Sequence, residues 1–248
     1  MPVHRVIFRA DLGSANYEIL DNPGSVLRIL QGAGESFFKQ VQDAAVNRTI
    51  VGSTGQVGDS ESYRMSVSPL AIDFSYETAA GIDFQKFEAA ETLRALFKYT
   101  QELTEHFKIR QLQRAGLRLY YLGSVGKGTS ELVPVFRKAT HSAFVDAIGE
   151  SIGSPADYGF HFDGEKEALK YHLHFGPYRS QEAARYFETV HSKLDTIGKG
   201  NIVCDLDQYE ESFVQTVTWS VWTRTAVTRA VDFVSRLERS LNEQINVD

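Results

Sequence analysis

Four residues in the second half of the chain have the types and the spacing of metal ligands. His172 and His174 are two residues apart, so on a strand both imidazoles would project from one face, about 7 Å apart. His161 and Asp163 lie on an expected partner strand and could complete the set. Because catalytic zinc takes three protein ligands and a water, these residues suggest a metal-dependent hydrolase. We favour the simpler interpretation of a solvent-facing strand side, since no H-E-x-x-H spacing accompanies them.

Other patterns suggest chemistry without completing a site. Asp205 and Asp207 could share one strand face and hold Mg²⁺, but an acidic strand end before a helix explains them more simply. The Gly-rich stretch 123–130 lies between an expected strand and helix, yet its spacing does not fit a phosphate-binding loop. Cys204 lies in an apolar run and is expected in the core. We therefore expect a protein that is not an enzyme and needs no cofactor.

Aromatic residues recur on the expected strands and could line an apolar pocket for a small ligand. A curved sheet wrapped around a long helix can leave such a pocket between the two layers. The candidate lining residues are Tyr63, Phe74, Tyr76, Tyr120, Tyr158 and Phe160. A small-ligand binder is therefore one alternative function, beside the metal-dependent hydrolase.

Two tryptophans near the start of the last expected helix suggest a protein interface. Trp219 and Trp222 are three residues apart and should share one helix face. Large aromatic residues anchor interfaces, although they are also common in cores. With no catalytic constellation in the sequence, the leading hypothesis is a non-enzymatic binding or assembly module in a cytosolic complex. Its partner would be another protein or a second copy of the chain.

Alternating apolar residues predict the strands that would position these groups. Two hairpins are expected, one with its turn at Ser68–Pro69 and one with its turn at Asp163–Gly164. The expected strands cover residues 1–10, 63–67, 72–76, 114–121, 158–162, 171–175 and 201–206.

Apolar residues at three- and four-residue steps predict helices over 83–107, 129–148 and the last segment of the chain, with a shorter one at 35–45. Hairpins imply antiparallel pairing, so we expect an α+β fold with a curved antiparallel sheet covered by long helices. A hairpin followed by a long helix occurs twice. This order raises the hypothesis of two similar halves, 1–125 and 126–248, which could share one core.

Composition excludes several classes of protein. The chain has 248 residues, of which 42% are hydrophobic and 23% charged, as in an ordinary globular protein. Its net charge of −6 argues against general nucleic-acid binding. No apolar run approaches the ~20 residues of a membrane-spanning helix, so no membrane association is expected. A single cysteine and the absence of a signal-peptide pattern predict a cytoplasmic location.

The strand over 114–121, with the sequence Arg-Ala-Gly-Leu-Arg-Leu-Tyr-Tyr, resembles a family of uncharacterised bacterial proteins. This sporadically distributed family carries an R-x-G-L-R-Y strand near mid-chain. The resemblance extends to the hairpin over 63–76, the long helix over 83–107, the D-x-D strand around Asp205 and the C-terminal helix. This chain departs from the pattern at Leu119 and over 123–157. The resemblance implies no known activity and no catalytic residues.

Overall fold

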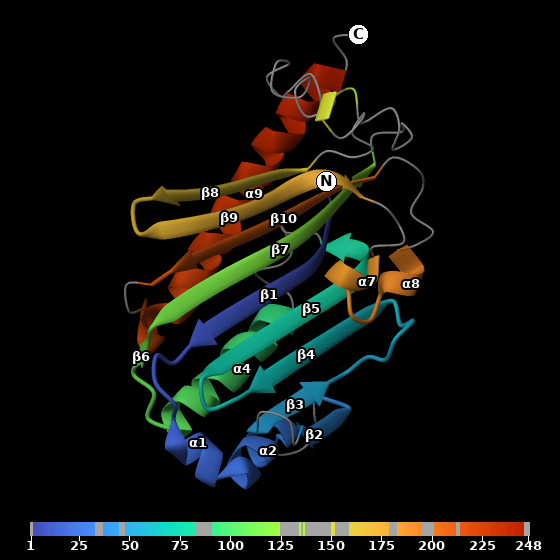
Figure 1. Cartoon of the computed structure of the whole chain (residues 1–248). Coiled ribbons are helices and arrows are strands. Elements are labelled where there is room, and N and C mark those ends of the chain that lie inside the picture. The colour runs from blue at the N-terminus through green and yellow to red at the C-terminus, as the bar shows by residue number, and fades with distance from the viewer. Residues whose placement is uncertain are drawn as a thin grey trace.

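The strands form one large sheet in this computed structural model. The structure describes residues 2–32, 37–44, 48–82, 91–124, 134, 136, 150–151, 159–178, 183–194, 201–211 and 214–245. Within these residues, nine antiparallel strands pair in the order β2-β3-β4-β5-β1-β7-β10-β9-β8, as Figure 1 shows. Long helices pack on the sheet, so the expected α+β class is confirmed.

The strand bounds show that the sheet brings together both ends of the chain. The first strand lies in the middle of the sheet, between two strands that start 60 and 103 residues after it ends. The strands are β1 (Val3–Asp11), β2 (Gln40–Ala44), β3 (Thr49–Ser53), β4 (Glu61–Val67), β5 (Ala71–Ile82), β7 (Arg114–Ser124), β8 (Phe160–Lys166), β9 (Leu169–Tyr178) and β10 (Asn201–Glu210).

Helices cover the two faces of the sheet unequally. One face packs against α1 (Tyr17–Asp21), α2 (Pro23–Gln31), α4 (Glu91–His106) and the 27-residue α9 (Trp219–Ile245). The opposite face carries only two short helices among the described residues, α7 (Ala183–Tyr186) and α8 (His191–Leu194). Figure 1 shows both arrangements. Near the start of α9, β6 (Gln111–Leu112) pairs with β11 (Val214–Gln215), and η3 (Thr216–Thr218) follows.

Side-chain alternation on the central strands creates the two different faces. On β1, Val6, Phe8 and Ala10 are buried in the main hydrophobic core beneath the long helices. Arg5 and Arg9 alternate with them and project from the other side. A second, smaller core under α7 and α8 contains Tyr120, Leu122, Phe187, Val190, Leu194 and Val203.

Two local expectations are wrong. Residues 40–44, within the helix expected at 35–45, form β2 instead, because this segment pairs with β3 along the edge of the sheet. The turn expected at Asp163–Gly164 also lies elsewhere, since β8 continues to Lys166 and Asp163 pairs with His172. The chain reverses after Lys166, where Glu167 has a φ of 58°.

Other expectations are confirmed or lie outside the described residues. The first hairpin forms as expected, with Val67 opposite Ile72 and the Ser68 hydroxyl accepting from the Ala71 amide at 3.0 Å. The helix α4 confirms the helical spacing in the last two thirds of 83–107. Most of the helix expected at 129–148 lies outside the described residues. The division into two similar halves stays a prediction, with strands of both halves in one sheet.

No helix in the described ranges combines the length and apolarity needed to cross a membrane.

The thiol of Cys204 on β10 gives a test of the core. The side chain is fully buried, and burial, followed by the neighbouring Asp205 carboxylate, raises its pKa to about 12. A thiol in this state is a poor nucleophile at neutral pH. We expect a thiol-reactive dye to label the native protein at least ~100-fold more slowly than the denatured chain. Equal labelling rates in the two states would contradict the buried position of β10.

Candidate functional site

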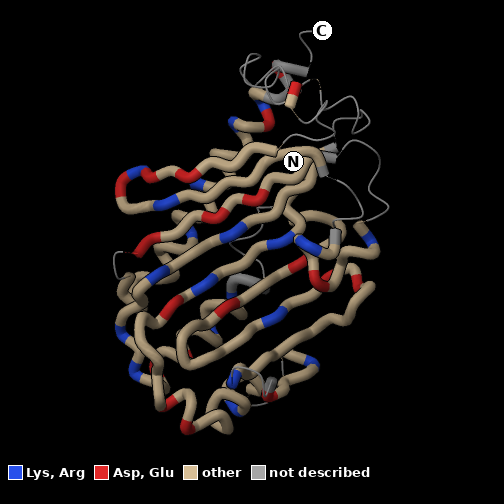
Figure 2. The backbone as a smooth tube through the Cα atoms, viewed as in Figure 1, with Lys and Arg blue, Asp and Glu red and all other residues tan. Residues whose placement is uncertain are grey.

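The sheet face that carries α7 and α8, here called the charged face, has rows of alternating charge across its central strands. Figure 2 shows acidic residues on β5 and β10, on either side of the arginines of β1 and β7. The strand register explains the rows. Arg9 lies opposite Asp73 on one side, and Arg118 lies opposite Asp207 on the other. Cross-strand neighbours of opposite charge stabilise antiparallel sheets, so these rows of charge contribute to the pairing of the strands.

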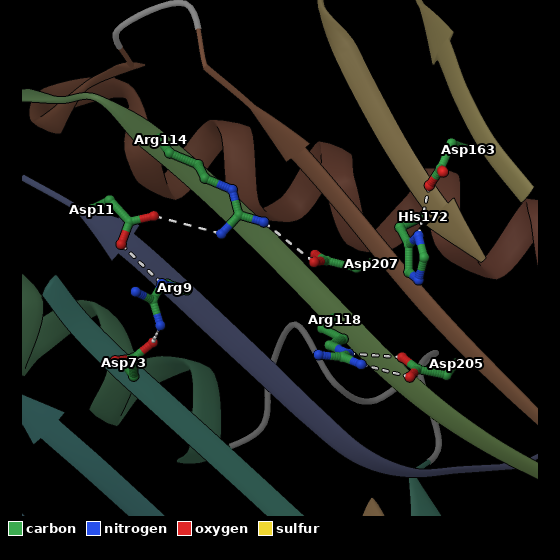
Figure 3. A network of polar contacts seen from close by, with 9 residues as sticks. All are labelled: Arg9, Asp11, Asp73, Arg114, Arg118, Asp163, His172, Asp205 and Asp207. Atoms are coloured by element: carbon green, nitrogen blue, oxygen red, sulfur yellow. Dashed lines mark hydrogen bonds and ion pairs between the residues drawn. The ribbon is translucent and has the colours of Figure 1, made fainter. Parts of the chain in front are cut away.

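Ion pairs connect four strands at one end of the charged face (Figure 3). Arg9 on β1 donates to Asp11 at 2.8 Å and lies 3.4 Å from Asp73 of β5. Arg114 on β7 bridges Asp11, at 3.5 Å, and Asp207 of β10, at 3.2 Å. Burial raises the pKa of the Asp73 and Asp207 carboxyls, although the neighbouring arginines act in the opposite direction.

Arg118, the next arginine along β7, forms a bidentate ion pair. The Nε and Nη2 groups of Arg118 donate to the two carboxylate oxygens of Asp205, at 2.8 and 2.6 Å. These hydrogen bonds raise the pKa of the Arg118 guanidinium, which also lies 5.1 Å from the centre of the Tyr120 ring. Two parallel hydrogen bonds of this kind fix the orientation of a guanidinium group more closely than one bond does. Asp205 is buried, whereas the Arg118 side chain keeps 40% of its exposure.

Between these pairs lies a hollow of about 350 Å³, here called the arginine depression. Five arginines and three carboxylates line it, together with four uncharged residues from the central strands. The lining residues are Arg5, Ile7, Arg9, Arg64, Ser66, Asp73, Ser75, Arg114, Gly116, Arg118, Glu188 and Asp207. None of them is a histidine or cysteine; the two hydroxyl groups belong to Ser66 and Ser75, and the Ser66 side chain is hydrogen-bonded to Asp73.

One wall of the depression is held by a buried carboxylate. Glu77 on β5 is 3% exposed and accepts the backbone N–H groups of Glu188, at 2.9 Å, Thr189, at 2.7 Å, and Val190, at 3.3 Å. Its charge is balanced by Arg5, whose Nε lies at 3.1 Å. A carboxylate that accepts several backbone amides forms strong, charge-assisted hydrogen bonds. Glu77 therefore anchors the segment between α7 and α8 to the sheet.

The anchored segment brings a second carboxylate to the rim. Glu188 accepts from Arg5 at 2.6 Å and also pairs with Arg64 of β4. Arg5 further donates to the Tyr186 carbonyl at 2.8 Å, so it ties the segment to β1 at two points. Burial alone would raise the pKa of the Glu188 carboxyl, but Arg5 and Arg64 lower it below its usual range.

The anchoring role of Glu77 predicts that its removal lowers the free energy of unfolding. Glu77→Ala removes the acceptor of three amides and leaves the largely buried Arg5 with one carboxylate fewer. We expect a loss of about 3 kcal/mol in the free energy of unfolding, measured by urea denaturation. The matched control is Glu165→Gln on the exposed β8, which should change stability by less than about 0.5 kcal/mol. Equal effects of the two substitutions would contradict the anchoring role.

The four predicted metal ligands do gather on the charged face, on β8 and β9. The rings of His161 and His174 stack with centroids 4.4 Å apart, and the His172 Nδ1 lies 2.6 Å from the Asp163 carboxylate. Stacked rings direct their nitrogen lone pairs side by side rather than toward one point. No group of three His, Cys, Asp or Glu side chains in the described residues could hold a metal ion. The metal-dependent hydrolase stays a prediction.

The five aromatic pocket candidates that the structure describes do not lie together. Tyr63 and Tyr76 stack at 4.6 Å and pack with the buried Phe74 against the helix-covered face. Tyr120 packs in the smaller core on the opposite face, and Phe160 lies near the far edge of the sheet. Tyr158 lies outside the described residues. Residues on opposite faces of a sheet cannot line a single pocket.

The two tryptophans have different surroundings. Trp219 is 4% exposed and belongs to the main core. Trp222 is partly buried, and its indole N–H donates to Glu210 at 2.9 Å. Trp219 therefore presents almost no surface to a partner, which removes half of the proposed interface pair.

Sequence reasoning singled out none of the residues of the anchor. Glu77 and Arg5 lie on the polar sides of alternating strands, which is a signal for a solvent-facing position. Their common partner, the segment at 186–190, is more than 100 residues away in sequence. The sequence pattern predicts that Asp205 and Asp207 share a face, and they do; Asp205 pairs with Arg118 and Asp207 with Arg114.

Comparison with known proteins adds no further constraint, since no family model, no curated protein and no solved structure matches the chain.

Proposed function

We propose that this chain is a non-enzymatic binding module that recognises a small anion, carrying phosphate or several carboxylates, in the arginine depression. The observation that carries the proposal is Gly116. This glycine lies in the interior of the central strand β7, opposite Arg9 and Tyr209. Glycine weakens a strand interior and often marks a place where a ligand approaches closely.

Neither backbone strain nor crowding requires glycine at position 116. Its φ lies outside the left-handed region, and an added Cβ would have Tyr209 Cβ at 3.6 Å and Arg114 Cζ at 3.8 Å as its nearest neighbours. Those are ordinary contact distances, so alanine fits. Any longer side chain would project among the arginines. The glycine therefore keeps open a place where a ligand would contact several guanidinium groups.

The arginines retain hydrogen-bonding capacity for an anion. Arg9, Arg64 and Arg118 have side chains between 40% and 48% exposed. Each guanidinium has five N–H donors, and Arg118 uses only its Nε and Nη2 groups on Asp205. Arginine recognises phosphate and carboxylate oxygens in the same forked geometry that it uses here on aspartate. The existing carboxylates orient the arginines in advance, which reduces the ordering cost of binding.

The volume of the arginine depression limits the size of the ligand. A hollow of about 350 Å³ lies at the small end of ligand-binding sites. It accommodates a phosphate, a pyrophosphate or a citrate-sized polycarboxylate. We further propose a cytoplasmic site of action, which the single buried cysteine of the chain supports.

Filling the depression tests the proposal. We expect wild-type protein to bind pyrophosphate in isothermal titration calorimetry, and Gly116→Leu to weaken that binding at least about tenfold because the side chain occupies the ligand's place. Gly116→Ala is the matched control and should bind within about threefold of wild type, with a slightly raised unfolding temperature. Arg64→Gln on the rim provides a second variant if Gly116→Leu fails to fold. No binding by wild type up to ~10 mM pyrophosphate would overturn the proposal.

The raised pKa values of Asp73 and Asp207 predict the pH dependence of binding. As the pH falls toward these pKa values, both carboxyls begin to take up protons and repel an anion less. Sulfate remains a dianion throughout, so its affinity should rise as the pH is lowered from about 8 to about 5. Asp207→Asn should raise sulfate affinity at neutral pH and flatten part of this rise. Affinity that falls on acidification would contradict the assignment of the site.

A further inference from the structure

The strand β8 forms one edge of the sheet. Figure 1 shows it at the margin, and within the described ranges its one strand partner is β9. All of its residues from His161 to Lys166 are exposed. The outer side of an edge strand presents a row of backbone N–H and C=O groups, which can pair with a strand of another chain. The backbone of β8 is therefore available for such pairing.

An exposed aromatic side chain accompanies this edge. Phe162 is 56% exposed and is the only strand residue among the exposed large apolar side chains of the described part of the chain. It stacks on Phe160 with ring centroids 6.0 Å apart, and it lines a groove of about 530 Å³ between the β8–β9 hairpin and α9. Two residues along the strand, an added Cβ on Gly164 would have no atom within 4 Å. Apolar surface and open space thus adjoin the edge.

We propose that β8 pairs antiparallel with β8 of a second copy of this chain, so that the two sheets join at this edge. Such an interface has a two-fold axis, and the same surface of both copies forms it. Residues directly opposite each other in an antiparallel pair are either both hydrogen-bonded or both not, so the axis must pass beside one residue. An axis beside Phe162, Asp163 or Gly164 keeps most of β8 paired.

Charge excludes two of these three registers. An axis beside Asp163 sets the Asp163 carboxylates of the two copies directly opposite each other. An axis beside Gly164 sets Asp163 opposite Glu165 twice, once on each side of the axis. Like charges directly opposite each other destabilise an antiparallel pair. The register with the axis beside Phe162 has no such pair.

The register centred on Phe162 is self-complementary. It sets His161 of each copy opposite Asp163 of the other, and an imidazole N–H can donate to a carboxylate. It also sets the two exposed Phe162 side chains opposite each other, which removes apolar surface from water. Phe160 of each copy lies opposite Gly164 of the other, and an aromatic ring across from an edge glycine covers the space that the glycine leaves open. These matches favour a second copy over an unrelated strand.

Sedimentation velocity of the whole chain from ~1 to ~300 µM tests the association. A single pair of edge strands is a small interface, so we expect a monomer–dimer equilibrium with a Kd of about 10–100 µM. His161→Asp should raise this Kd at least about tenfold, because it sets aspartate opposite Asp163 at two positions. The matched variant His161→Lys keeps opposite charges there and should dimerise within about threefold of wild type or more tightly. A monomer at every concentration, or equal effects of the two substitutions, would overturn the proposal.

Cysteine cross-linking tests the register independently. Phe162→Cys puts two thiols beside the axis, at the Cα separation of about 4.5–5.5 Å that a disulfide can span. Diamide oxidises the two thiols to a disulfide and is itself reduced, so a covalent dimer should appear on a non-reducing gel. In the control Asp163→Cys, the thiols lie two residues out of register, beyond the limit of about 7 Å, and should cross-link at least about tenfold more slowly. The native Cys204 is buried and does not interfere. Cross-linking at position 163 as fast as at 162, or at neither, would overturn the proposal.

Discussion

The charged face depends on the buried pair between Glu77 and Arg5. A carboxylate and a guanidinium removed from water are costly unless their remaining hydrogen-bonding groups are satisfied, and here they are. Glu77 accepts three backbone amides of the segment between α7 and α8, while Arg5 holds the Tyr186 carbonyl and the Glu188 carboxylate. The pair thereby holds the short segment at 186–190 against the sheet, where it forms one wall of the arginine depression. Without that wall, the depression would lack Glu188 and the orientation that it gives to Arg64.

The unequal covering of the two faces explains how the arginine depression arises. The long helices bury one side of every central strand, which supplies the hydrophobic stabilisation of the fold. Among the described residues, only α7 and α8 cover the other side, and they lie at one end of it, so the strands can carry charges there. Alternation along each strand then places arginines and carboxylates in neighbouring rows, and Gly116 leaves a gap among them.

The sequence predicts well those features that depend on local pattern. Alternation over 114–121 correctly separates Leu117 and Leu119 in the core from Arg114 and Arg118 on the charged face. The same reasoning fails at 40–44, where a short apolar pattern fits either a helix or an edge strand and pairing with β3 decides. It also fails at Gly164, a residue typical of turns that here continues β8.

The candidate sites were less predictable because they depend on contacts between distant segments. Arg9 and Arg118 look like ordinary solvent-facing residues until the register places both beside Gly116 and Asp207. The role of Glu77 requires the segment at 188–190, which lies 111 to 113 residues away. Likewise, the spacing of Trp219 and Trp222 indicates a shared helix face but not that only one indole N–H finds a partner.

The most direct measurement is a crystal structure of the protein grown in sodium selenate, with the anomalous signal of selenium used to locate the anion. The binding function proposed for the charged face predicts a selenium peak in the arginine depression above Gly116. Its oxygens should lie within hydrogen-bond distance of at least two of the Arg9, Arg64 and Arg118 guanidinium groups. A depression that contains only water, with selenate bound elsewhere or not at all, would contradict the account.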